Sequence, residues 1–113
     1  MDGTLVAAVP DRHRLAACSF VNWADLVGEI LLVRHGGTGP QVHDHILLRL
    51  AERWPSPSII RFGVERCALL SMIGQGFGIT IVGTASSLLP TPGVVFLPVT
   101  DEPEPVAFFA VTP

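Results

Sequence analysis

The sequence predicts an α/β fold, a three-layer sandwich in which helices cover both faces of a mostly parallel sheet. Short apolar runs rich in β-branched residues alternate with segments of helical periodicity, and this order of strand, helix, strand, helix, strand is typical of parallel sheets. Glycine and proline separate these segments, as turns require. About half of the 113 residues are apolar, which is enough for one hydrophobic core, and the chain is too short for two domains.

The first predicted strand covers residues 4–9, an apolar run that is ended by a proline. After a polar turn, Asn22 is a suitable N-cap for a short helix over residues 23–27, and Gly28 is suited to end that helix. The apolar run 30–33 follows directly and predicts the next strand.

A glycine-rich loop, residues 34–40, leads into the longest predicted helix, residues 41–54. The two prolines that follow favour a helix end, and residues 58–62 form the next predicted strand. The apolar positions of the helix predict the face that covers the sheet: Val42, Ile46, Leu47, Leu50 and Trp54.

The hydrophobic period changes within residues 63–82, which predict a helix, a glycine turn and a strand. Gly74 and Gly76 favour a helix end, because glycine readily adopts the left-handed conformation after a last turn. Residues 77–82 are typical of a strand that is buried on both faces, and residues 93–97 predict one more strand of the sheet. The predicted core face of the helix consists of Val64, Ala68, Leu69, Met72 and Ile73.

The composition argues against several classes of function. All seven basic residues are arginine and the formal net charge is -3, so the chain lacks the basic surface that drives nucleic-acid binding. No apolar run approaches the roughly 20 residues of a membrane span, and the N-terminus lacks the basic region of a secretion signal, so we expect a cytoplasmic protein. Cys18 and Cys67 match neither a disulfide framework nor a zinc pattern, and we expect free, buried thiols and no cofactor.

Two stretches resemble catalytic loops of phosphatases, but each lacks a required partner. Residues 1–6 are similar to the aspartyl loop of haloacid-dehalogenase-like phosphatases, yet no nucleophilic aspartate stands two residues ahead of Asp2. Residues 30–39 are similar to the loop of histidine phosphatases, with Arg34 and His35, but that chemistry needs a second, downstream histidine. We predict that the chain is not an enzyme, and a histidine-phosphatase-like remnant stays open as the alternative.

His43, Asp44 and His45 look like a metal cluster by composition alone. Residues two apart on a helix point about 200° apart, so the two imidazoles cannot bind one ion. We therefore predict a solvated helix surface at this position and no metal site.

The loop that follows the strand 30–33 is the best candidate for a binding site. It offers backbone N–H groups at a helix N-terminus, glycines that allow close approach, and one arginine, which together suit a carboxylate. Ligands of open α/β sheets gather at the carboxyl ends of parallel strands, whereas the alternative is a plain strand-to-helix connection. The candidate ligand-binding residues at these strand ends are Arg34, His35, Gly36, Gly37 and Thr38, followed by Gly63 and Thr84.

Three motifs resemble the effector-binding domain of LysR-type transcriptional regulators. The first is His-x-Leu-Ala after an apolar strand, at residues 13–16, with Arg14 where the family usually has proline. The second is the Trp-Ala-Asp-Leu run within residues 21–28. The third joins a helix end, Gly-apolar-Gly and a β-branched strand, with Gly83 where the family often has proline. Residues that match this third motif are Leu70, Met72, Ile73, Gly76, Phe77, Gly78, Ile79 and Val82.

The resemblance extends from about residue 5 to residue 111 and implies a fold like that of type 2 periplasmic binding proteins. It implies that residues 1–113 are a partial effector-binding domain, namely the second subdomain with two crossing strands, at 4–9 and 106–111, and no DNA-binding domain. Such a domain would bind a small, often anionic, metabolite and shift the arrangement of attached DNA-binding parts, without contacting DNA itself. A homodimer formed through helices is a further implication, and a stand-alone solute-binding module is another alternative.

Overall fold

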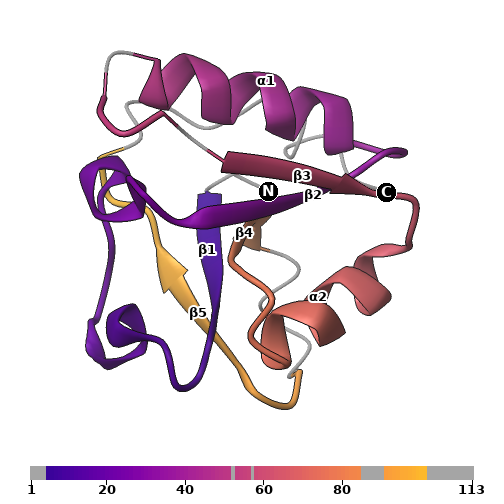
Figure 1. Cartoon of the computed structure of the whole chain (residues 1–113). Helices are drawn as coiled ribbons and strands as arrows, with labels where there is room; N and C mark the ends of the chain where they lie inside the picture. The colour runs from indigo at the N-terminus through magenta and orange to yellow at the C-terminus, as the bar shows by residue number, and fades with distance from the viewer. Residues whose placement is uncertain (1–4, 52, 57, 85–90, 102–113) are drawn as a thin grey trace.

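The computed structural model describes residues 5–51, 53–56, 58–84 and 91–101, which form a sheet with helices on both sides (Figure 1). Two short 3-10 helices, η1 and η2, connect the first two strands. The elements in chain order are β1 (Leu5–Pro10), η1 (Arg14–Ala17), η2 (Trp23–Leu26), β2 (Ile30–Arg34), α1 (Gly39–Leu50), β3 (Ser58–Phe62), α2 (Arg66–Gly74), β4 (Thr80–Gly83) and β5 (Val94–Pro98).

The sheet is mostly parallel. β1 lies between β4 and β5 and is antiparallel to both, while β2 and β3 are parallel to each other. A parallel bridge between Leu31 and Ile79 connects β2 to the residue that leads into β4. The strand order is therefore β3-β2-β4-β1-β5, and among the described strands only β1 runs in the opposite direction. This confirms the predicted sheet. The first predicted strand corresponds to β1, and its role as a crossing strand stays a prediction; the second predicted crossing strand, 106–111, lies outside the described residues.

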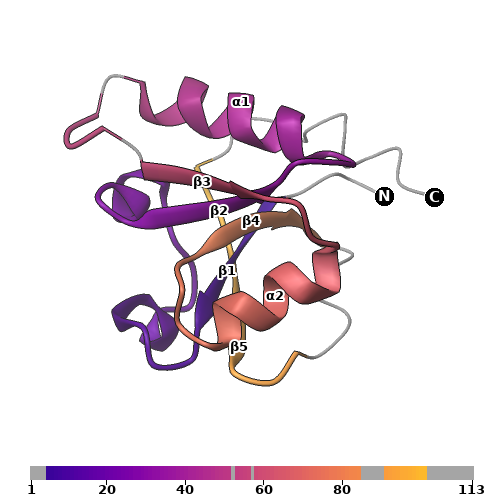
Figure 2. The ribbon, with the colours of Figure 1, turned by 45° about the vertical axis from the view of Figure 1, so that its right-hand side comes forward.

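The two helices cover opposite faces, which confirms the predicted three layers (Figure 2). Side chains alternate along each strand, so odd-numbered and even-numbered residues reach different faces. The odd-numbered strand residues pack with α1 and η2 in one core cluster, whose largest members include Leu31, Ile79 and Trp23. The even-numbered residues, such as Val6, Leu32 and Val82, pack with Leu69, Leu70 and Ile73 of α2 in the other.

Both helices are shorter than predicted. In α1, Val42, Ile46 and Leu50 are buried as predicted, but Leu47 is 43% exposed and Trp54 is 85% exposed. Trp54 was wrongly placed on this face because α1 ends at Leu50, four residues before the tryptophan, where the chain turns toward Pro55. Within the described residues, no helix has the length and apolar character that a membrane span requires.

In α2 the buried face is centred differently from the prediction. Leu70 is buried, whereas Ala68 is exposed, which makes the predicted place of Ala68 on the core face wrong. The strand that follows begins at Thr80 and not at Phe77, whose side chain is 55% exposed. A helix of nine residues has room for two turns of contact, so Leu69, Leu70 and Ile73 suffice to cover the sheet here.

The two cysteines are free but exposed, contrary to the prediction that both are buried. Cys67 lies in the first turn of α2, away from the face formed by Leu69 and Ile73, and Cys18 follows η1 in a turn. The usual burial of cysteine therefore gave the wrong expectation at two positions where local geometry directs the thiol to solvent.

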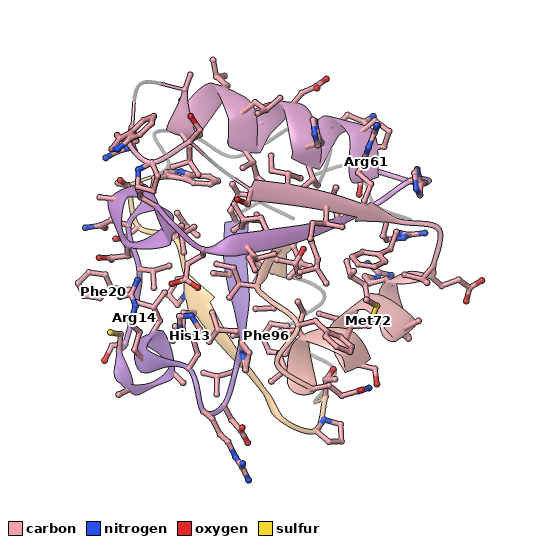
Figure 3. The ribbon with its side chains drawn as sticks, in the orientation of Figure 1. His13, Arg14, Phe20, Arg61, Met72 and Phe96 are labelled. Atoms are coloured by element: carbon pink, nitrogen blue, oxygen red, sulfur yellow. The ribbon has the colours of Figure 1, made fainter. Side chains whose placement is uncertain are left out.

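Polar contacts of His13 and Arg14, both labelled in Figure 3, stabilise the segment between β1 and β2. His13 caps η1, because its Nδ1 accepts a hydrogen bond of 3.0 Å from the Leu15 N–H group. Nε2 therefore carries the proton and donates to the Glu29 carboxylate at 2.7 Å, and Arg14 donates to the same carboxylate at 3.1 Å. Farther along, the backbone N–H group of Trp23 donates to the Asp101 carboxylate at 3.0 Å, which connects η2 to the residues after β5.

Candidate functional site

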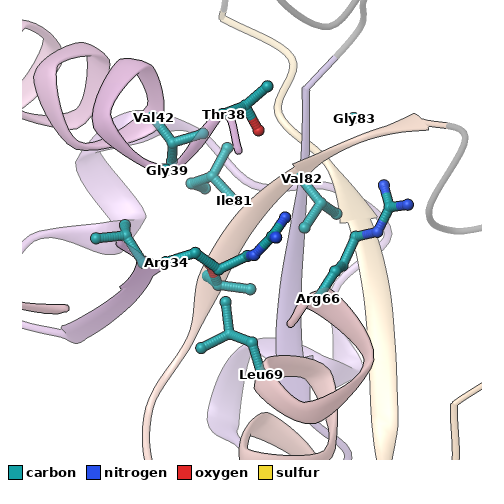
Figure 4. A pocket seen from close by; sticks show the side chains of 11 residues that line it. Arg34, Thr38, Gly39, Val42, Arg66, Leu69, Ile81, Val82 and Gly83 are labelled. Atoms are coloured by element: carbon teal, nitrogen blue, oxygen red, sulfur yellow. The ribbon is translucent and has the colours of Figure 1, made fainter. Parts of the chain in front are cut away.

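A pocket lies where the carboxyl ends of β2 and β4 meet the N-terminal ends of α1 and α2 (Figure 4). The pocket is a shallow hollow: about 420 Å³ of empty space lies in it and in the solvent at its mouth. This is the edge of a parallel sheet at which ligands of open α/β folds gather. Residues of all four elements form its wall, among them Arg34, Thr38, Arg66, Thr80, Ile81 and Gly83.

The pocket lies between β2 and β4. The two strands are paired near Leu31 and Ile79 and move apart toward their carboxyl ends. At the closed end, the Ile79 N–H group donates to the Ile30 carbonyl at 2.9 Å, and the Leu32 N–H group donates to the Ile79 carbonyl at 2.8 Å. Gly78 permits this approach, since a Cβ there would lie 2.6 Å from the Ile30 carbonyl oxygen. Beyond this point the two strands form no further ladder pairs in the described part of the chain.

Arg34 is the last residue of β2, and its side chain extends into the pocket (Figure 4). Its Nε donates a hydrogen bond of 3.2 Å to the Val64 carbonyl, which orients the guanidinium group. Gly37 leaves room for this group, because a Cβ at that position would lie 3.0 Å from Nη1. Arg34 is half-buried, so water screens its charge less than it would on an open surface.

Arg66 is a second cation at the pocket and approaches it from the first residue of α2 (Figure 4). Arg34 and Arg66, together with Glu65 and Cys67, also border a neighbouring surface hollow. No acidic side chain of the described residues lines the first pocket, whereas two guanidinium groups do. This charge distribution favours a small anion, and guanidinium groups bind carboxylates and phosphates through paired N–H donors.

The N-terminus of α1 offers fewer free donors than the sequence predicted. The Gly39 N–H group donates to the Gly36 carbonyl at 3.0 Å, and Pro40 has no N–H group. Gly39 packs against the end of β2, and a Cβ at this position would overlap the Arg34 carbonyl oxygen. The glycine-rich loop therefore also serves to seat α1 on β2, with Thr38 as the N-cap residue.

Of the seven predicted ligand-binding residues, Arg34 and Thr38 line the pocket. The other five lie outside its lining: His35, Gly36, Gly37, Gly63 and Thr84. The His35 N–H group donates to the Phe62 carbonyl at 2.9 Å and so continues the pairing of β2 with β3. Gly63 lies beside the His35 imidazole, and Thr84 follows Gly83, which does line the pocket. A role for these five residues in binding stays a prediction.

Sequence reasoning missed Arg66 and Thr80. A signal for Arg66 was present, because it stands in the first turn of the helix that follows β3, at the same sheet edge as Arg34. Thr80 gave no signal, since its hydroxyl donates to the Leu32 carbonyl, 48 residues away in the chain. Side chains that are defined by such long-range contacts are visible only in the folded structure.

The two histidines of α1, His43 and His45, have different neighbours. The His45 ring lies 5.8 Å from the Trp23 ring, measured between centroids, while His43 Nδ1 lies 3.7 Å from the Asp44 carboxylate. Both histidines are half-buried and not fully solvated as predicted. Among the described residues, no group of three or more histidine, cysteine, aspartate or glutamate side chains is placed to hold a metal ion.

The sheet order, the covering helices and the pocket at the strand ends define an α/β ligand-binding unit like those of periplasmic binding proteins. A two-arginine pocket in such a unit suits a small anion. The chain belongs to the family of LysR substrate binding domains, which it matches over residues 1–113. The comparison with curated proteins gave no match.

Several solved structures share the fold. The BenM effector binding domain with its effector benzoate is 22% identical and superposes with a TM-score of 0.76, over 91% of this chain and 47% of that chain. CbnR, a LysR family transcriptional regulator, is 19% identical with a TM-score of 0.72, over 92% of this chain and 37% of that chain. The regulatory domain of Synechocystis PCC6803 CcmR in complex with 2-PG is 17% identical with a TM-score of 0.70, over 93% of this chain and 50% of that chain. The chain thus spans about half the length of the two effector-domain structures.

Proposed function

We propose that the chain binds a small anionic metabolite in the pocket between β2 and β4, as part of the effector-binding domain of a LysR-type transcriptional regulator. The observation that carries this proposal is the half-buried Arg34, oriented by the Val64 carbonyl and directed into a pocket that Arg66 also lines. The related BenM and CcmR domains are described with benzoate and with 2-PG, and benzoate is a carboxylate.

The pocket suits a ligand with one charged and one apolar part. Because the Val64 carbonyl uses the Nε–H of Arg34, the terminal N–H groups are left to face a carboxylate as a pair. Val42, Leu69 and Ile81 line the same pocket and offer contacts to hydrocarbon. A carboxylate that replaces its hydration with guanidinium contacts in such a half-buried site gains more than it would at an exposed arginine.

Replacing Arg34 by alanine should weaken binding of benzoate or 2-PG by roughly 10- to 100-fold, the cost of losing a charge-assisted hydrogen-bonding group. The matched control is Arg61→Ala, which removes the same charge from an exposed residue of β3 outside the pocket lining. Isothermal titration calorimetry on the whole chain would measure both. Equal weakening by the two substitutions would indicate a general charge effect and contradict a site at Arg34.

We further propose that this chain is one ligand-binding half of a two-part domain and that it senses its ligand without contacting DNA. The family is one of ligand-binding domains, the chain spans about half of the related effector domains, and its formal net charge is -3. A ligand that favours one arrangement of the two halves would shift their populations and so the geometry of attached DNA-binding parts. Such a regulator would work in the cytoplasm.

We propose that the chain has no phosphatase activity. The His35 imidazole lies outside the lining of the pocket, beside Gly63. The three other histidines lie at the start of η1 and in α1. His13 caps η1, His45 lies against Trp23, and His43 lies beside Asp44. A histidine phosphatase requires a second histidine beside the nucleophilic one, and the contacts described for these histidines place none beside His35.

A further proposal concerns self-association through the outer face of α1, where Leu47 is 43% exposed and Leu48 is 66% exposed. A two-fold dimer would place this face against its own copy and bury both leucines, as the family resemblance implies. Leu48→Glu should weaken the dimer by roughly tenfold or more, measured by sedimentation equilibrium. Phe20→Glu is the control, because Phe20 is 51% exposed but lies outside α1. A monomeric wild-type chain, or equal effects of both substitutions, would contradict the proposal.

A further inference from the structure

Thr80 stands at the point where β2 and β4 separate. Its side chain is buried, with a residue exposure of 1%, and its hydroxyl donates a hydrogen bond of 2.6 Å to the Leu32 carbonyl. Thr80 also lines the pocket, and the bridge between Leu31 and Ile79 immediately precedes it. The hydroxyl contact therefore follows the last ladder pair that joins β2 to β4 among the described strands.

The direction of the backbone groups follows from the pairing of both strands. Ile79 exchanges hydrogen bonds with Ile30 and Leu32 of β2, so its N–H and carbonyl groups face β2. Alternate residues of a strand face the same neighbour, which means that the N–H group of Ile81 also faces β2. By the same rule the Arg34 N–H group faces β4, since the Leu32 N–H group does.

A parallel ladder that continued past Ile79 would use these groups. The Ile81 N–H group would donate to the Leu32 carbonyl, and the Arg34 N–H group would donate to the Ile81 carbonyl. Among the described strands, β2 and β4 form no ladder beyond the isolated bridge of Leu31 with Ile79, and the Leu32 carbonyl is bonded by the Thr80 hydroxyl. The N–H groups of Ile81 and Arg34 are consequently left without a ladder partner, and both residues line the pocket.

We propose that Thr80 is a positioning residue: its hydroxyl ends the pairing of β2 with β4 and thereby leaves the N–H groups of Ile81 and Arg34 free to donate to a bound anion. The last part of this statement rests on the function proposed above, whereas the ending of the ladder is independent of any ligand. Threonine suits the role because its hydroxyl reaches a neighbouring carbonyl while its methyl group keeps the volume of a valine.

Amide hydrogen exchange of the whole, ligand-free chain, followed by NMR, tests the ladder directly. In the wild-type chain the Ile81 amide should exchange faster than the Ile79 amide, which is bonded to the Ile30 carbonyl. In Thr80→Val the Leu32 carbonyl loses its hydroxyl donor and the Ile81 N–H group should replace it, slowing exchange at Ile81 by roughly tenfold or more. Thr80→Ser keeps the hydroxyl and should retain the wild-type pattern.

The proposal is overturned if the Ile81 amide is already as protected as the Ile79 amide in the wild-type chain, or if Thr80→Val leaves exchange at Ile81 unchanged. Should Thr80→Val fail to fold, an Ile81 amide as protected as the Ile79 amide in the wild-type and Thr80→Ser chains still overturns the proposal. Benzoate titrations of the same samples separate the two proposals. Absence of binding to the wild-type chain with the expected exchange pattern refutes the proposed function and leaves the ladder role of Thr80 standing.

Discussion

Substitution of Gly39 by alanine is expected to destabilise the chain by about 3 kcal/mol or more, because the added Cβ would overlap backbone atoms and not a movable side chain. At Gly39 the Cβ would overlap the Arg34 carbonyl oxygen and lie 2.6 Å from the carbonyl carbon. Relief requires that α1 moves away from the end of β2. Since Arg34 and Thr38 line the pocket from these two elements, the same movement should also weaken anion binding.

Gly36→Ala is the matched control for this substitution. Gly36 belongs to the same loop, yet a Cβ there would meet no atom within 4 Å. Urea denaturation followed by circular dichroism should show a free energy of unfolding within about 0.5 kcal/mol of wild type for Gly36→Ala and a large loss for Gly39→Ala. Similar stability of the two variants would show that α1 is not seated on β2 as described.

Trp23→Ala should cost about 3 to 5 kcal/mol of stability, the range measured for deleting a large buried aromatic side chain. Trp23 is 2% exposed and belongs to the core cluster beneath α1, where its ring lies 5.8 Å from that of His45. Removing the indole leaves a cavity between η2, α1 and the sheet, and neighbouring side chains fill such a cavity only in part.

The control for Trp23→Ala is Trp54→Ala, which deletes the same side chain at a position that is 85% exposed. Its effect on the free energy of unfolding should stay within about 0.5 kcal/mol, as is usual for surface substitutions. Thermal unfolding followed by circular dichroism avoids dependence on tryptophan fluorescence, which each variant alters. A larger loss for Trp54→Ala than for Trp23→Ala would contradict the described core.

The strands could be predicted because each carries a local signal of its own. Residues 58–62 form β3 with the predicted bounds, the predicted strand 30–33 lacks only the last residue of β2, and the predicted strand 93–97 is shifted by one residue from β5. A short run of β-branched and apolar residues between turns has few other stable solutions in a mixed α/β chain. The parallel order followed from the alternation of strands and helices.

Exposure and helix ends were less predictable, since they depend on contacts between distant segments. Ala68 fitted a helical period, but in a helix of nine residues the sheet contacts Leu69, Leu70 and Ile73 instead. Trp54 also fitted a period, yet the helix ends at Leu50. Helical periodicity in the sequence indicates that a helix has an apolar face, but it does not show which residues of that face contact the sheet.

The site could be predicted only in part for the same reason. Arg34 was identifiable because it follows an apolar strand and precedes a helix start, and the carboxyl ends of parallel strands are where ligands bind. Arg66 comes from another helix, and Thr80 bonds a carbonyl 48 residues away. No short segment of the sequence contains these relations, which arise when β2, β4 and α2 come together.

The most direct test of the account is an NMR titration of the isotope-labelled chain with benzoate. A site between β2 and β4 predicts that the largest amide shift changes fall at Arg34, Thr38, Ile81 and Gly83 and saturate together. Residues around the polar pocket at the opposite end of the fold, such as Asp11 and Gln75, should not respond. Shift changes centred on that opposite pocket, or none at the ends of β2 and β4 while benzoate or another small carboxylate binds, would contradict the central claim.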